Sequence, residues 1–252
     1  MSAPVASVAR ALALLDEVAR SDHGLGVNEL ARRIGVNAST ASRLLATLEA
    51  GGLVERSPDG PYRLGLKLVA LSDRVLGQLD VRERARPWLT WLVEETGETA
   101  TLSVPGGGEA ITVDFVPSSS SVVSMARVGR PSVAHATAAG KVMLAFGTPG
   151  GAGDRAAPGE LTAFTDRTIT DPDLLAAELE AVRTSGLAEA VGEREPDLNA
   201  LAAPVIGRGG ELVAILGLQG PAARLPANTR RALRAPLRKA AGELGRSLGG
   251  PG

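Results

Sequence analysis

The apolar residues of the first 64 positions constrain the fold most strongly, because their spacing changes from helical to strand-like. Apolar side chains recur at i, i+3, i+4 and i+7 over residues 7–20, 27–34 and 41–48, and each stretch predicts a helix with one buried face. Asn37 or Ser39 can cap the third helix. The segment LVERSPDGPYRLG then predicts two strands around a Pro-Asp-Gly turn. In the first helix, the expected buried face comprises Val8, Ala11, Leu12, Leu15, Val18 and Ala19.

A turn of only Gly-Val-Asn separates the second predicted helix from the third, as in a winged helix-turn-helix. On the third helix Ser39 and Arg43 lie opposite the apolar stripe, and Thr40 and Ser42 lie on its flanks. Short side chains and one bidentate donor near a helix N-terminus suit the major groove, where arginine reads guanine and hydroxyls bind phosphates or bases. The pattern predicts binding to double-stranded DNA. A polar face that serves only protein assembly remains the alternative.

A narrow apolar row follows the predicted hairpin, at Leu64, Leu68, Leu71, Val75 and Leu79. This spacing suits a helix that pairs with another helix. The partner helix can belong to a second subunit or to the same chain, and the periodicity does not choose between them. A further helix is predicted over residues 81–95, with Trp88, Leu89 and Leu92 on one face.

The second half of the chain alternates β-type runs with separate helices. TATLSVPGGGEAITVDFVP predicts a hairpin, and NALAAPVIGR and ELVAILGLQGP predict two strands joined by a Gly209-Gly210 turn. VVSMARV and GLAEAVGER predict further short strands. Helices are predicted for HATAAGKVMLAF, for the segment that Asp171-Pro172 opens, and for residues 226–248 with a break or bend near Pro236. This arrangement predicts an α+β domain on an antiparallel sheet.

Composition argues against several classes of function. The chain has 252 residues, a formal net charge of −1 and no cysteine, which excludes disulfides and thiol chemistry and leaves nucleic-acid binding neither favoured nor excluded. His23 and His135 are the only histidines, no Gly-x-Ser-x-Gly occurs, and AAGKV lacks residues that a P-loop requires. Glu193 and Glu195 leave a paired-carboxylate site conceivable. We expect no enzymatic activity, no cofactor or metal, no membrane span and a cytoplasmic location.

Seven segments occur in an order and spacing that resembles the IclR family of transcriptional regulators: SVARALALLDEVA, NELARRIGVNASTASRLLATLEAGGLVER, YRLGLKLVAL, HATAAGKVMLAF, RTITD, GEREP and LAAPV. The resemblance implies a winged helix-turn-helix domain (residues 1–64), a linker helix (65–80) and a GAF-like α+β effector-binding domain (81–252). It also implies a homodimer or homotetramer that binds an operator, as a repressor, and responds to a small carboxylic or aromatic acid. The alternative is a ligand-binding or interaction module whose helix-turn-helix serves only assembly.

The resemblance extends the predicted DNA-binding set beyond Ser39, Thr40, Ser42 and Arg43 to the hairpin. There, Arg56 and Arg63 would contact the DNA backbone. Many relatives carry a lysine or a Pro-Lys pair where this chain has Ala38, and a histidine where it has Ser42. These departures change the expected operator sequence rather than the expectation of DNA binding.

The resemblance also implies an effector-binding set: Met125, Ser132, Ala138, Ala139, Ala190, Ala200, Gly217 and Gln219. Backbone amides of Ala138 and Ala139, at the start of a helix, would hold a carboxylate. An acidic residue, a cysteine and two serines of relatives correspond here to Ala190, Ala200, Gly217 and Gln219. Fewer polar partners predict a roomier, more apolar site that prefers an aromatic or medium-length carboxylic acid to glyoxylate or pyruvate. The alternative is that these small residues face the core without any ligand.

Overall fold

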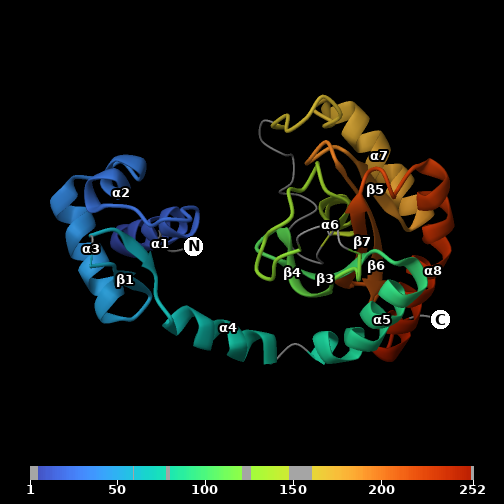
Figure 1. Cartoon of the computed structure of the whole chain (residues 1–252), viewed down its shortest axis with the longest axis horizontal. Helices are drawn as coiled ribbons and strands as arrows, with labels where there is room; N and C mark the ends of the chain where they lie inside the picture. Colours follow the sequence, from blue (N-terminus) through green and yellow to red (C-terminus); the bar gives the residue numbers. More distant parts are fainter. Residues whose placement is uncertain (1–4, 59, 78–79, 121–125, 148–160, 251–252) are drawn as a thin grey trace. The chain divides into compact units, whose positions relative to one another are not determined.

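The chain folds into two compact units, Met1–Gln78 and Leu79–Gly252 (Figure 1). The computed structural model describes residues 5–58, 60–77, 80–120, 126–147 and 161–250. Each unit contains a hydrophobic core of its own. The finer division into residues 1–64, 65–80 and 81–252 stays a prediction.

The N-terminal unit contains the helices and the hairpin that the apolar spacing predicts. Its elements are α1 (Ala6–Ala19), α2 (Val27–Arg33), α3 (Ala38–Ala50), β1 (Val54–Arg56), β2 (Tyr62–Leu64) and α4 (Lys67–Gly77). Asn37 caps α3, because its side-chain oxygen accepts a hydrogen bond from the Thr40 N–H at 2.7 Å. Strands β1 and β2 pair antiparallel. Leu14, Leu30 and Leu45 bury one face of each of the first three helices.

The buried face of α1 differs from the prediction. Val8 and Leu12 are 55% and 58% exposed, whereas Leu14 and Val18 are buried. Positions 11, 14, 15 and 18 also follow the i, i+3, i+4, i+7 spacing, so an α1 that is apolar around most of its surface satisfies the helical period in two rotations. Packing against α3 and the hairpin selects the rotation that buries Leu14.

The end of α3 and the start of α4 meet backbone to backbone. Gly52, with φ at +72°, turns the chain after α3, and the Gly65 N–H donates a hydrogen bond to the Leu53 carbonyl at 2.9 Å. A Cβ on Gly65 would overlap the Gly52 carbonyl oxygen. Only glycine therefore fits at position 65 without moving the junction between these helices.

The C-terminal unit is built on one antiparallel sheet with the strand order β4-β3-β7-β6-β5. Its strands are β3 (Thr99–Gly106), β4 (Glu109–Val116), β5 (Ala188–Val191), β6 (Leu198–Ile206) and β7 (Leu212–Pro221). Its helices are α5 (Asp80–Thr96), α6 (Ala138–Phe146), α7 (Pro172–Ser185) and α8 (Ala227–Ser247). The antiparallel sheet and the α+β class agree with the sequence prediction, and VVSMARV lies largely outside the described residues.

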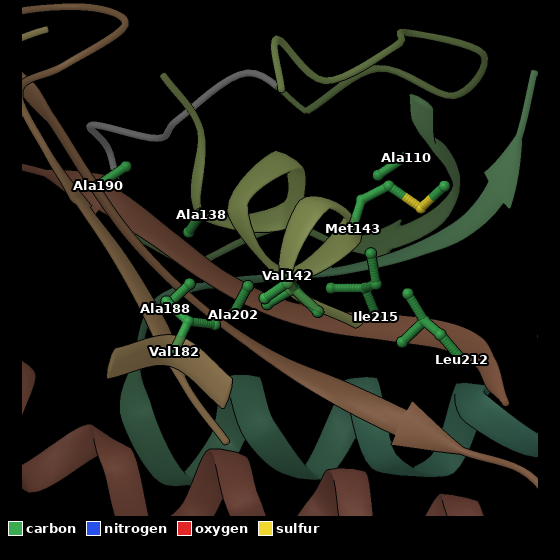
Figure 2. Packing of buried hydrophobic residues seen from close by; sticks show 11 residues of the cluster. Ala110, Ala138, Val142, Met143, Val182, Ala188, Ala190, Ala202, Leu212 and Ile215 are labelled. Atoms are coloured by element: carbon green, nitrogen blue, oxygen red, sulfur yellow. The ribbon is translucent and has the colours of Figure 1, made fainter. Parts of the chain in front are cut away.

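Helices cover both faces of this sheet. Ala202 and Ile215 pack against α6 on one face, and Figure 2 shows α6 above the sheet with helices below it. On the opposite face, Glu189 forms ion pairs with arginines of α8, and Asp114 forms ion pairs with arginines of α5. Ala202 and Ile215 thus belong to the face that α6 covers, whereas ion-paired carboxylates lie on the opposite face.

Local signals explain where the helices of this unit begin. Thr137 caps α6, so the helix starts at Ala138 rather than at His135 as the sequence predicts. The His135 Nε2 atom instead lies 2.9 Å from the Thr162 carbonyl oxygen. Asp171 caps α7 and Pro172 occupies its first turn, as predicted, and α8 continues through Pro236 without a break. No helix in the described part of the chain is long and apolar enough to cross a bilayer.

Candidate DNA-binding and effector-binding faces

The first two turns of α3 present the residues predicted to bind DNA. Ser39, Ser42 and Arg43 are exposed and Thr40 is half-buried, while Ala41, Leu45 and Leu48 on the opposite side are buried. The buried side chains hold the helix on the core, so its N-terminal polar face points away from the unit. The structure thus brings all four predicted α3 residues onto one accessible helix end.

Arginines on this unit fall into two groups by their partners. Arg32 and Arg33 of α2 bind Glu29 at 2.7 and 2.8 Å, and these hydrogen bonds lower the pKa of Glu29 to about 2. Arg43 and Arg63 are exposed and have no acidic partner among the described residues. Arg56 lies over the Tyr62 ring, with its guanidinium carbon 5.8 Å from the ring centroid. Arg10 of α1 is likewise exposed without an acidic partner among the described residues. The arginines of α3 and the hairpin are the unneutralised ones that belong to the predicted DNA-binding set.

The predicted effector-binding residues of the sheet share the face beneath α6. One cross-strand row consists of Ala190, Ala200, Gln219 and Thr99. The neighbouring row consists of Ala188, Ala202, Gly217, Thr101 and Phe115. Direct cross-strand partners point to the same side of a sheet, and the alanines of both rows pack in one cluster with Ala138. The register therefore places Gly217 and Gln219 on the α6 face as well.

The start of α6 offers unused backbone donors above these rows. Thr137 Oγ1 accepts a hydrogen bond from the Gly140 N–H at 3.1 Å, but the N–H groups of Ala138 and Ala139 have no acceptor among the described residues. Gly140 allows the preceding turn to lie close, because a Cβ there would be 2.5 Å from the Val133 carbonyl oxygen. Free amides at a helix N-terminus favour an anion.

Met125 lies outside the described residues, and Ser132 is half-buried with its N–H donating to the Ala110 carbonyl at 2.8 Å. The expectation that Gly217 leaves open space is wrong. Thr101 Oγ1 lies 2.5 Å from the position that a Cβ on Gly217 would occupy, so the threonine side chain already fills that volume.

Residues 7–58 match the family model described as the IclR helix-turn-helix domain, and residues 73–246 match the one described as bacterial transcriptional regulator IclR C-terminal. The chain belongs to the IclR family. It is thus a transcriptional regulator of the helix-turn-helix class, with a second domain of the type that binds ligands in this family.

Individual IclR relatives match over most of their length. The chain is 31% identical to the HTH-type transcriptional regulator XynR of Escherichia coli, with 98% of each chain covered. It is 29% identical to the DNA-binding transcriptional repressor YiaJ of E. coli, with 96% of this chain and 88% of YiaJ covered. A crystal structure of an IclR homologue from Microbacterium hydrocarbonoxydans, complexed with 4-hydroxybenzoate, has 25% identity and a TM-score of 0.76 over 96% of this chain and 99% of its own.

Lys141 is a central residue of this IclR-family domain that sequence reasoning missed. Its side chain is 1% exposed, and its Nζ donates to Glu193 Oε1 at 2.7 Å, to Glu178 Oε1 at 3.0 Å and to the Glu189 carbonyl at 2.9 Å. Helix α6 is thereby tied to α7 and to β5. In the sequence, Lys141 stood out only as part of AAGKV, which does not fit a P-loop.

Glu195 forms an exposed ion pair with Arg130, whereas Glu193 binds Lys141. Glu193 and Glu195 therefore do not form the paired-carboxylate site that their spacing left conceivable.

Proposed function

We propose that this IclR-family protein is a repressor that leaves its operator when an aromatic or medium-length carboxylic acid binds beneath α6. The observation that carries the proposal is the pair of free amides at Ala138 and Ala139 above a sheet face of small apolar side chains. The two amides can donate hydrogen bonds to a carboxylate, and the alanines of the cross-strand rows can contact the apolar part of the same ligand. The relative that binds 4-hydroxybenzoate supports an aromatic acid, and the repressor YiaJ supports repression.

On the DNA side, α3 is the proposed recognition helix. Arg43 is the long donor on its exposed face, and Ser39, Thr40 and Ser42 surround it with hydroxyls. Arginine binds guanine through two parallel hydrogen bonds in the major groove. Arg56 and Arg63 of the hairpin are assigned in this proposal to the phosphate backbone, which would supply affinity rather than sequence specificity.

We also propose that two copies pair through α4. Leu71 is 45% exposed and Leu68 is half-buried, so their side of α4 stays accessible to a second helix. On the opposite side, Val69 of α4 is 65% exposed, and Leu66, just before the helix, is 78% exposed. A helix that is apolar on both sides and open to solvent in the single chain needs a partner, and a pair of copies would read an operator with two-fold symmetry.

The first test measures DNA binding by fluorescence anisotropy, on a duplex selected from a random pool and on an unselected duplex, across a salt series. We expect log K to fall steeply with log salt. Arg43→Ala should weaken binding of the selected duplex by about 1–3 kcal/mol. Arg32→Ala is the matched control, because Glu29 already neutralises Arg32, and it should change binding by less than about 0.5 kcal/mol. Binding without salt dependence would support the assembly-only alternative.

The second test addresses the acid. Ligands that bind the folded state raise the melting temperature, so a panel of aromatic and aliphatic carboxylic acids is screened by thermal shift. The acid that stabilises the protein should also lower its affinity for the selected duplex, because coupling between two sites is reciprocal. A rise in DNA affinity would contradict derepression by the acid. Glyoxylate or pyruvate as the tightest ligand would contradict the proposed ligand class.

A further inference from the structure

We infer that the Thr101 hydroxyl selects among carboxylic acids by binding a second polar group, such as a ring hydroxyl, on the ligand. The inference rests on the proposed effector-binding function of the α6 face and deepens it. It assigns the ligand to the class of aromatic acids that carry a carboxylate at one end and a hydrogen-bonding substituent elsewhere on the ring.

The side chain of Thr101 is placed by the sheet itself. Thr101 of β3 is the cross-strand partner of Gly217 of β7, which in turn is the partner of Ala202 of β6. Because Gly217 has no side chain, Thr101 Oγ1 extends into its volume and lies 2.5 Å from where a Cβ would stand. The hydroxyl thus extends over the centre of the sheet, in a row whose other members are Ala188, Ala202, Gly217 and, on β4, Phe115.

Neighbouring hydroxyls on the same strand are satisfied, and that of Thr101 is not. Thr99 Oγ1 accepts a hydrogen bond from the Ser118 N–H at 3.1 Å, and Ser103 Oγ lies 3.4 Å from Thr112 Oγ1. Thr101 is 9% exposed, and its hydroxyl makes no hydrogen bond to another described residue. Thr101 Oγ1 is not among the fully buried side-chain atoms that lack a partner, so the hydroxyl keeps some accessible surface. A hydroxyl that is accessible, unpartnered within the described residues and on a proposed ligand-binding face is available to a polar group of a ligand.

The chemistry of that partner follows from the surrounding groups. The free amides of Ala138 and Ala139 suit an anionic carboxylate, and the cluster that joins Ala138 to Ala190 and Ala202 is apolar. A ligand whose carboxylate meets the amides has its ring over the alanine rows. In the row of Ala202 and Gly217, the Thr101 hydroxyl is then the polar group that a ring substituent can reach. Benzoate would leave this hydroxyl unpaired, whereas a hydroxybenzoate can pair it.

The test compares benzoate, 3-hydroxybenzoate and 4-hydroxybenzoate by isothermal titration calorimetry of the full-length protein. The wild type should bind the better hydroxybenzoate about tenfold more tightly than benzoate, which corresponds to about 1.4 kcal/mol. Thr101→Val keeps the shape and removes the hydroxyl, so benzoate and the preferred hydroxybenzoate should bind it equally. Thr101→Ser should restore the preference. Ser103→Ala, a hydroxyl deletion on the same strand and face, should keep it.

The outcomes separate the inference from the proposed function. A Thr101→Val protein that keeps the preference, or a wild type that binds all three acids equally, overturns the inference and leaves the acid-binding function standing. A wild type that binds none of the three acids overturns both for this ligand class. Melting temperature without ligand is a second measurement. It should be unchanged or higher in Thr101→Val, because an unpaired hydroxyl is removed, and a fall of several degrees would show a structural hydrogen bond instead.

Discussion

Replacing Lys141 by methionine removes the buried ammonium group that joins α6, α7 and β5. Its strongest contact is with Glu193, whose side chain is 9% exposed and lies 2.7 Å away. After the substitution this carboxylate remains buried without its opposite charge. Removing one partner of a buried ion pair costs about 3–5 kcal/mol, because the remaining charge is uncompensated. We expect Lys141→Met to lower the free energy of unfolding of the C-terminal unit by this amount.

Urea unfolding followed by tryptophan fluorescence measures this loss selectively. The chain has two tryptophans, Trp88 and Trp91, and both lie on α5 of the C-terminal unit. With a slope of about 2 kcal/mol per molar urea, the expected loss moves the midpoint down by about 1.5–2.5 M. Lys67→Met is the control, because Lys67 is an exposed lysine of the N-terminal unit, and it should leave this transition unchanged.

A second substitution identifies the cause of the loss. Adding Glu193→Gln to Lys141→Met removes the stranded charge and should recover about 2 kcal/mol, since a neutral buried group costs less than an unpaired ion. A midpoint shift below about 0.5 M for Lys141→Met would refute the reasoning, because the pair would then contribute little. A double variant no more stable than the single one would show that packing of the lysine stem, rather than charge, is what matters.

Three further results are expected. Double substitution of Leu68 and Leu71 by glutamate should give monomers in analytical ultracentrifugation, and a persisting dimer would place the subunit contact elsewhere. Ala200→Phe should abolish the acid-induced rise in melting temperature and leave DNA binding intact, and a normal response to the acid would exclude Ala200 from the site. Burial raises the pKa of Glu189, but hydrogen bonds and charges of two α8 arginines outweigh it and hold the pKa below its ordinary value of 4.5. Glu189→Gln should therefore destabilise the protein at pH 7, and the difference in melting temperature should shrink as pH falls below about 4.5, whereas a constant difference would refute the charge contribution.

Features that depend on neighbouring residues in the sequence were predictable. The α3 face was predictable because Ser39, Arg43 and the buried leucines belong to one helix, whose period alone separates the two sides. Asn37 and Asp171 were predictable as caps because capping is a local interaction. Hairpin turns likewise predicted an antiparallel sheet, and the register then followed from pairing in the structure.

Features that depend on distant residues were not predictable. Lys141 meets Glu178 and Glu193, which are 37 and 52 positions away, and no local pattern announces such contacts. The same holds for Thr101, because its position on the proposed ligand-binding face depends on the pairing of β3 with β7, which makes Gly217 its neighbour. Glycine at position 217, where relatives have serine, was expected to leave space in the site. The Thr101 side chain of β3 occupies that space instead.

The close contact between Gly65 and Gly52 sets the direction in which α4 leaves α3 within the N-terminal unit. Because the two backbones touch there, this direction cannot change without breaking the contact. If two subunits join through α4, the distance between their two reading helices is set by this junction in each copy. In that case the geometry of the N-terminal unit determines how many base pairs separate the two half-sites. The dimer would then not bind operators whose half-sites are spaced differently, whatever their base sequence.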